Sequence, residues 1–198
     1  MSDTLQTLME AGRLSPLSYY FARFIARGSG VPEDSVLAHS AALVSMRNLQ
    51  GDVCVDLRQL AGSPLFEADD EHPLDPPRAP GLEDWVGTLA VAGWVGGPGE
   101  ATPLILDGRR LFLGKYWHFE HQVASALTAR MALVDGLDIP RLTQGLARLF
   151  PQPGDGAVDW QKVAAAIAVR RHFAVISGGP GTGGDCRRCH AITAVASG

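Results

Sequence analysis

The feature that most constrains this chain is a glycine-rich loop that directly follows a short apolar run. Residues 173–176 (FAVI) have the length and composition of a buried strand in a parallel sheet. The loop matches the first six positions of the phosphate-binding pattern G-x-x-x-x-G-K-[ST]. These six residues are Gly178, Gly179, Pro180, Gly181, Thr182 and Gly183. A strand followed by such a loop predicts the opening of an α/β domain built around a phosphate site.

The next two residues depart from this pattern at its chemically decisive positions. Glycines let successive backbone N–H groups point at phosphate oxygens, while the lysine reaches the β- and γ-phosphates and the hydroxyl ligates Mg²⁺. Here Gly184 stands at the lysine position and Asp185 at the hydroxyl position. The main positive charge is therefore absent, and a carboxylate would repel the γ-phosphate. The sequence predicts a damaged phosphate loop, with a plain glycine-rich turn as the alternative.

Composition limits the class of protein. The 198 residues, 46% of them hydrophobic, suffice for one ordinary domain or two small ones. A net charge of −4 without a basic block gives no electrostatic signature of a nucleic-acid surface. The first residues lack the basic-then-apolar pattern of a signal peptide, and no apolar run reaches membrane-spanning length. We therefore expect no membrane contact and a cytoplasmic location.

The first half of the chain has mainly helical periodicity. Ser15 and Pro16 are typical of a helix start, and Pro32 is expected to open a second helix. Apolar residues recur at helical spacing as the expected buried sides of these helices: Leu17, Tyr20, Phe21, Phe24 and Ile25 in the first, and Val36, Leu37 and Val44 in the second. Alternation of Val53, Val55 and Leu57 with polar neighbours then predicts a short strand.

The second half alternates helices with one hairpin. Residues 62–81 are expected to form an exposed loop, and 104–106 and 111–113 to pair as a hairpin through Asp107 and Gly108. Helices are expected over 82–93, 115–131, 140–150 and 160–171. Their expected apolar sides include Trp85, Leu89 and Ala92 in the first of these helices, and Trp117, Val123, Ala124 and Leu127 in the second.

Several separate segments resemble, in order, the alpha-subunit family of bacterial exodeoxyribonuclease V, the RecD family. They are residues 51–57 (GDVCVDL), 102–113 (TPLILDGRRLFL), 116–124 and 160–183. The resemblance implies an α+β N-terminal docking domain over 1–114. It also implies the incomplete start of a RecA-like P-loop α/β motor domain over 115–183. Residues 184–198 form a tail with no likeness to the family.

The resemblance also implies an activity for the intact family. Its members are ATP- and Mg²⁺-dependent 5′→3′ DNA helicase subunits that work with beta and gamma subunits on DNA in double-strand break repair and recombination. The N-terminal domain is implied to dock on the gamma subunit. Gln161 lies where the family places a glutamine that reads adenine, which joins it to residues 178–183 as a candidate nucleotide contact. A solvated glutamine in the first turn of a helix is the alternative.

The departures at Gly184 and Asp185 lead to three hypotheses. In the first, a disrupted or shifted reading frame has left an inactive fragment, without productive binding of ATP or Mg²⁺. In the second, residues 1–114 survive as a module that docks on the gamma subunit without ATPase activity. In the third, the chain is a residual nucleotide binder without turnover. None of the three assigns a catalytic residue or a metal ligand.

Other conspicuous residues are expected to be structural. Cys186, Cys189 and His190 match the haem-attachment pattern C-x-x-C-H, but haem attachment needs export and zinc needs four ligands. The four tryptophans are expected to pack in the protein interior rather than stack on bases. His118 and His121 are spaced for a metal, but without a carboxylate or cysteine partner we expect a solvated or interface face.

Overall fold

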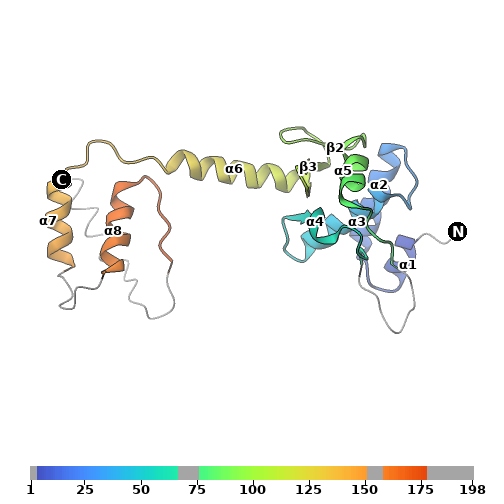
Figure 1. Cartoon of the computed structure of the whole chain (residues 1–198), viewed down its shortest axis with the longest axis horizontal. Helices are drawn as coiled ribbons and strands as arrows, with labels where there is room; N and C mark the ends of the chain where they lie inside the picture. Colours follow the sequence, from blue (N-terminus) through green and yellow to red (C-terminus); the bar gives the residue numbers. More distant parts are fainter. Residues whose placement is uncertain (1–3, 67–75, 151–157, 178–198) are drawn as a thin grey trace. The chain divides into compact units, whose positions relative to one another are not determined.

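The computed structural model describes residues 4–66, 76–150 and 158–177, and the chain divides into two compact units (Figure 1). The first unit is Met1–His121 and the second is Gln122–Gly198. The expected domain limits at residues 114 and 183 stay predictions. The mixed helices and strands of the first unit agree with the α+β class, whereas the RecA-like start stays a prediction.

The first unit opens with three helices, α1 (Thr4–Glu10), α2 (Pro16–Ser29) and α3 (Val36–Leu49). The hydroxyl of Ser15 accepts the Ser18 N–H at 3.1 Å, so the expected N-cap of α2 is confirmed. Helix α3 begins later than expected. Its N-cap is Ser35, whose hydroxyl accepts the Ala38 N–H at 3.2 Å, and Pro32 instead opens the turn before it.

Four short strands form one sheet in the order β1-β4-β3-β2. They are β1 (Cys54–Asp56), β2 (Val95–Gly96), β3 (Leu104–Asp107) and β4 (Arg110–Leu113). The expected hairpin is confirmed, because β3 pairs antiparallel with β4 and Gly108 takes a left-handed φ of 60° at the turn. Strand β1 pairs antiparallel with β4, and β2 pairs parallel with β3.

The sheet has apolar side chains on both faces. Val55, Leu104 and Leu111 join the main core with α1, α2, α3, α4 (Leu57–Leu60) and α5 (Leu82–Ala90). Trp85 of α5 is fully buried there, and its indole N–H donates to the Ser40 hydroxyl at 2.8 Å. Ile105 and Phe112 face the other way, where Trp117 from the first turn of α6 (Gly114–Arg130) covers them.

The second unit has a much smaller core. Helices α7 (Ile139–Leu149) and α8 (Trp160–Arg170) lie side by side (Figure 1). Their buried residues are Leu142, Leu146, Phe150, Ala165 and Val169. The strand expected over 173–176 is wrong, because these residues are not in a strand and Val175 and Ile176 are exposed. A strand needs a neighbour for its N–H and C=O groups, and the described residues place none beside it.

Some expected apolar sides are also wrong. In α2 the buried residues are Ser18, Tyr19, Ala22, Ile25 and Ala26, so of the five expected residues Ile25 alone is fully buried. In α6, Trp117 is buried, but Val123 is exposed. The loop expected over 62–81 is not exposed throughout, because Leu65, Phe66 and Ala79 enter the main core. In both helices local periodicity identified the element, but the surrounding elements decided which side became buried.

Candidate functional site

The loop residues expected to bind phosphate, Gly178 to Gly183, lie outside the described residues, as do Gly184, Asp185 and the Cys186–His190 motif. Gln161 is described. The structure therefore does not test whether Gln161 and the loop come together. Their assignment to a nucleotide site stays a prediction based on sequence.

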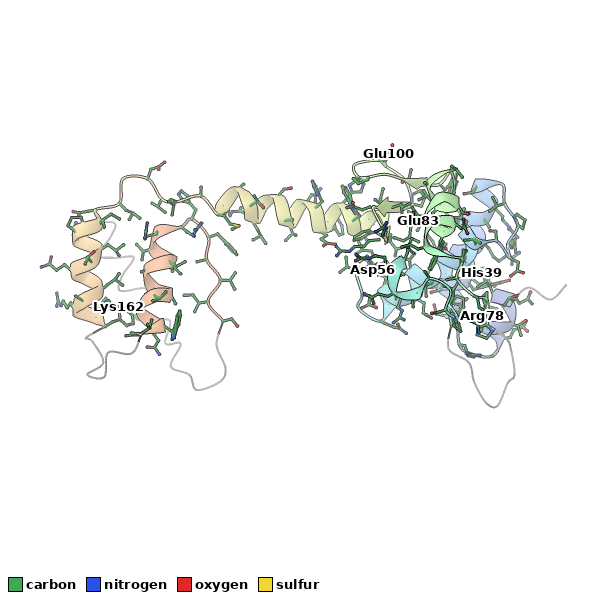
Figure 2. All side chains as sticks on the ribbon, viewed as in Figure 1. His39, Asp56, Arg78, Glu83, Glu100 and Lys162 are labelled. Atoms are coloured by element: carbon green, nitrogen blue, oxygen red, sulfur yellow. The ribbon has the colours of Figure 1, made fainter. Side chains whose placement is uncertain are left out.

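Gln161 occupies the first turn of α8 at the surface of the second unit. The Asp159 carboxylate caps this helix, accepting the N–H of Gln161 at 3.0 Å and of Lys162 at 3.1 Å (Figure 2 labels Lys162). The side chain of Gln161 is exposed, one turn before buried Ala165. The cap fixes the backbone of Gln161, and its exposed position is compatible with either role considered for it.

The two histidines of α6 have structural contacts. A ring nitrogen of His118 lies 3.2 Å from the Glu100 carbonyl oxygen, and the His121 ring stacks on Trp117 with centroids 4.9 Å apart. Among the described residues, no group of three His, Cys, Asp or Glu side chains is close enough to share a metal ion. Within those same ranges, no helix combines the length and apolar character needed to cross a bilayer.

A cluster of charged residues surrounds the start of α4 and the β3–β4 turn. Asp56 accepts two hydrogen bonds from the Arg58 guanidinium, at 3.0 and 2.7 Å, and also caps α4 (Figure 2). The hydrogen bonds from Arg58 hold the pKa of Asp56 down to about 2. Arg109 pairs with Glu83 at 3.2 Å. Because these arginines already have carboxylate partners, the cluster is a weak candidate for binding an anion.

A groove along α2 is the more informative surface, and the sequence did not predict it. It is lined by Tyr20, Arg23, Phe24, Arg27, Gly28 and Trp94. The rings of Phe24 and Trp94 meet edge to face with centroids 4.9 Å apart. The helical spacing predicts Tyr20 and Phe24 on a buried side of α2, whereas both are exposed. The signal that could have corrected this is the run of small residues on the other side of the helix, at Ser18, Ala22 and Ala26, which allows closer packing on α3.

Comparison with known proteins identifies the family. Residues 10–112 match the family described as "RecBCD enzyme subunit RecD, N-terminal domain". The chain is 28% identical to RecBCD enzyme subunit RecD of Haemophilus influenzae, with 92% of this chain and 31% of that protein covered. It is 33% identical to the subunit of the same name from Mycolicibacterium smegmatis, over 86% of this chain and 27% of that protein.

A third relative, RecBCD enzyme subunit RecD of Mycobacterium tuberculosis, is 31% identical over 92% of this chain and 28% of its own length. The chain thus spans less than a third of the length of these curated relatives. The family match covers just over half of the chain and coincides with the helices and sheet of the first unit, from the end of α1 to β4. The chain therefore belongs to the RecD family of RecBCD enzyme subunits.

Proposed function

We propose that this chain acts through a RecBCD-type complex, as a docking module that binds the gamma subunit without hydrolysing ATP. The observation that carries the proposal is that residues 10–112, which match the family, lie within the unit that has a continuous core of its own. A domain with its own core can present a fixed surface to a partner without help from the rest of a larger subunit.

The proposed absence of ATP turnover rests on the residues at the phosphate loop. Gly184 supplies no cation for the β- and γ-phosphates, and Asp185 would add negative charge where the hydroxyl ligand of Mg²⁺ belongs. Gly184 and Asp185 do not fit ATP with its Mg²⁺ ion, so no catalytic step is assigned to the phosphate loop. The role we propose in DNA repair and recombination is therefore exerted through assembly, with motor activity belonging to intact members of the family.

Co-expression tests the docking role. The tagged full chain is produced together with the beta and gamma subunits encoded in the same genome, and the retained proteins are quantified after washing. We expect the gamma subunit to be retained in stoichiometric amount. Recovery of the tagged chain without the gamma subunit, in a sample whose circular dichroism shows folded helices, would refute the docking role.

Nucleotide measurements test the other half of the proposal. A fluorescent ATP analogue with Mg²⁺ should give no saturable binding, and phosphate release should stay at the level of buffer. Turnover that is abolished by Gly181→Asp, a change that blocks the backbone approach to phosphate, would contradict the proposal. Saturable binding without turnover would instead support the residual nucleotide binder.

A further inference from the structure

The outward side of α2 carries an apolar stripe that the protein's own core does not use. Leu17, Tyr20 and Phe24 are 63%, 59% and 56% exposed. Their positions follow the i, i+3, i+7 spacing, so the three side chains lie along one side of the helix. The opposite side of α2 is already buried against the core. A helix that is apolar on both sides exposes one of them at a cost unless a partner covers it.

The stripe borders a preformed groove. Gly28 is essential to its shape, because a Cβ atom at that position would overlap the indole ring of Trp94. Trp94 can therefore lie directly over the last turn of α2, where its ring meets Phe24 at an interplanar angle of 72°. The resulting open space has a volume of about 460 Å³, and Tyr20, Phe24 and Trp94 are among the residues that line it. Rigid aromatic anchors of this kind are typical of the centres of protein interfaces.

The charges at the groove select among possible partners. Arg23 and Arg27 both pair with one carboxylate, Glu33, at 2.6 and 2.9 Å. Two guanidinium groups sharing one carboxylate leave a net positive charge at this rim. Arg27 is largely exposed, and among the described residues Glu33 is its one ion-pair partner. A complementary partner therefore carries a carboxylate beside its apolar side chains.

We propose that this groove receives an amphipathic helix of a partner protein, whose apolar side covers Leu17, Tyr20 and Phe24 and whose carboxylate meets Arg27. The proposal rests on the docking role proposed above and names the surface that performs it. In helix-in-groove recognition the apolar side of an incoming amphipathic helix lies along an exposed apolar surface, and the stripe on α2 is such a surface. A second copy of this chain fits less well, because a two-fold contact would bring two positively charged rims together. Single-stranded DNA fits less well because Glu33 and an aliphatic Leu17 border the aromatic rings.

The test uses the tagged full chain co-expressed with the beta and gamma subunits. The variant Leu17→Ser/Tyr20→Ser removes two of the three stripe residues while leaving the contact between Phe24 and Trp94. We expect it to retain at least about tenfold less gamma subunit than the wild type, since the loss of two interface anchors costs 1.4 kcal/mol or more. Arg27→Glu should also reduce retention, and more strongly at low than at high salt, because it reverses the rim charge.

The matched control is Val91→Ser. Val91 is 85% exposed at the end of α5 and does not line the groove, so this variant should retain the gamma subunit like the wild type. Circular dichroism melts of all variants must agree within a few degrees, which separates loss of the surface from loss of the fold.

The outcomes distinguish the two proposals. If the wild type retains the gamma subunit and Leu17→Ser/Tyr20→Ser does so equally, the groove proposal is wrong and the docking role stands. If the folded wild type retains none, both proposals fail. Light scattering that shows a dimer dissociated by the same double variant would assign the groove to a second copy. Binding of a fluorescent 16-nucleotide oligothymidylate that the double variant abolishes would assign it to DNA. Either result overturns the helix proposal.

Discussion

The two units of this chain both contain helices but have very different amounts of core. In Met1–His121 the helices pack around α3 and one face of the sheet, so α3 is buried over most of its length. In Gln122–Gly198, α7 and α8 each contribute a single buried side, and Trp160, at 74% exposed, lies outside the cluster. Helical stability comes mainly from packing of the apolar side, so we expect the first unit to be the more stable of the two.

The strongest test of this comparison substitutes one tryptophan in each unit. Trp85→Ala removes a fully buried ring and leaves the Ser40 hydroxyl without its indole donor, so we expect a loss of about 3–5 kcal/mol in the free energy of unfolding. Trp160→Ala, at an exposed position, should change it by no more than about 0.5 kcal/mol. Urea unfolding of the full chain, followed by circular dichroism, measures both. Similar losses in the two variants would refute the comparison.

A second substitution asks whether the small core unfolds alone. Leu146→Ala should cost about 2–5 kcal/mol, which we expect to exceed the local stability of the α7–α8 pair. Hydrogen exchange should then become fast throughout both helices while amides of α3 remain protected. Arg148→Ala, two residues further along α7 on its exposed side, is the control and should leave exchange unchanged. Loss of protection in α3 as well would mean that the two units unfold together.

Replacing either of two glycines of the first unit with alanine should change the stability of the unit, but in opposite directions. Gly28→Ala places a Cβ where the Trp94 ring lies, and overpacking of this kind costs about 1–3 kcal/mol, less the 0.5–1 kcal/mol that alanine gains in a helix. Gly87→Ala in α5 meets no atom within 4 Å, so it should stabilise the unit by about 0.5–1 kcal/mol. Thermal unfolding compares the two. A stabilising Gly28→Ala would show that Trp94 is free to move away.

The smallest expected effect concerns pH. Because the pKa of Asp56 is lowered to about 2 in the folded unit, its contribution to stability is present above the unfolded value of about 3.9 and is lost as the pH falls toward 2. Arg58→Ala should raise the pKa of Asp56 and reduce this pH dependence. Carboxyl NMR titration measures the shift. Arg109→Ala, which removes a pair with Glu83 instead, should leave the pKa of Asp56 unchanged.

Much of the first unit could be predicted because its signals are local. Ser15 caps α2, and the turn at Asp107 and Gly108 makes the β3–β4 hairpin, as expected from turn chemistry. The surface groove could not be predicted, because Tyr20 and Phe24 have the spacing of core residues. Periodicity shows that a side chain lies on an apolar stripe, but it does not say whether another element of the same chain covers that stripe.

The family of the chain and most of its helices and strands were determined by the sequence itself, through segments such as residues 102–113 and through capping and turn residues. The departure from the phosphate-loop pattern at Gly184 and Asp185 is likewise a fact of sequence. Tertiary structure decided which of two apolar sides of α2 is buried, and that residues 173–177 are not a strand. The physical reason is that burial and strand pairing depend on partners distant in the chain, whereas caps and turns depend on neighbours a few residues away.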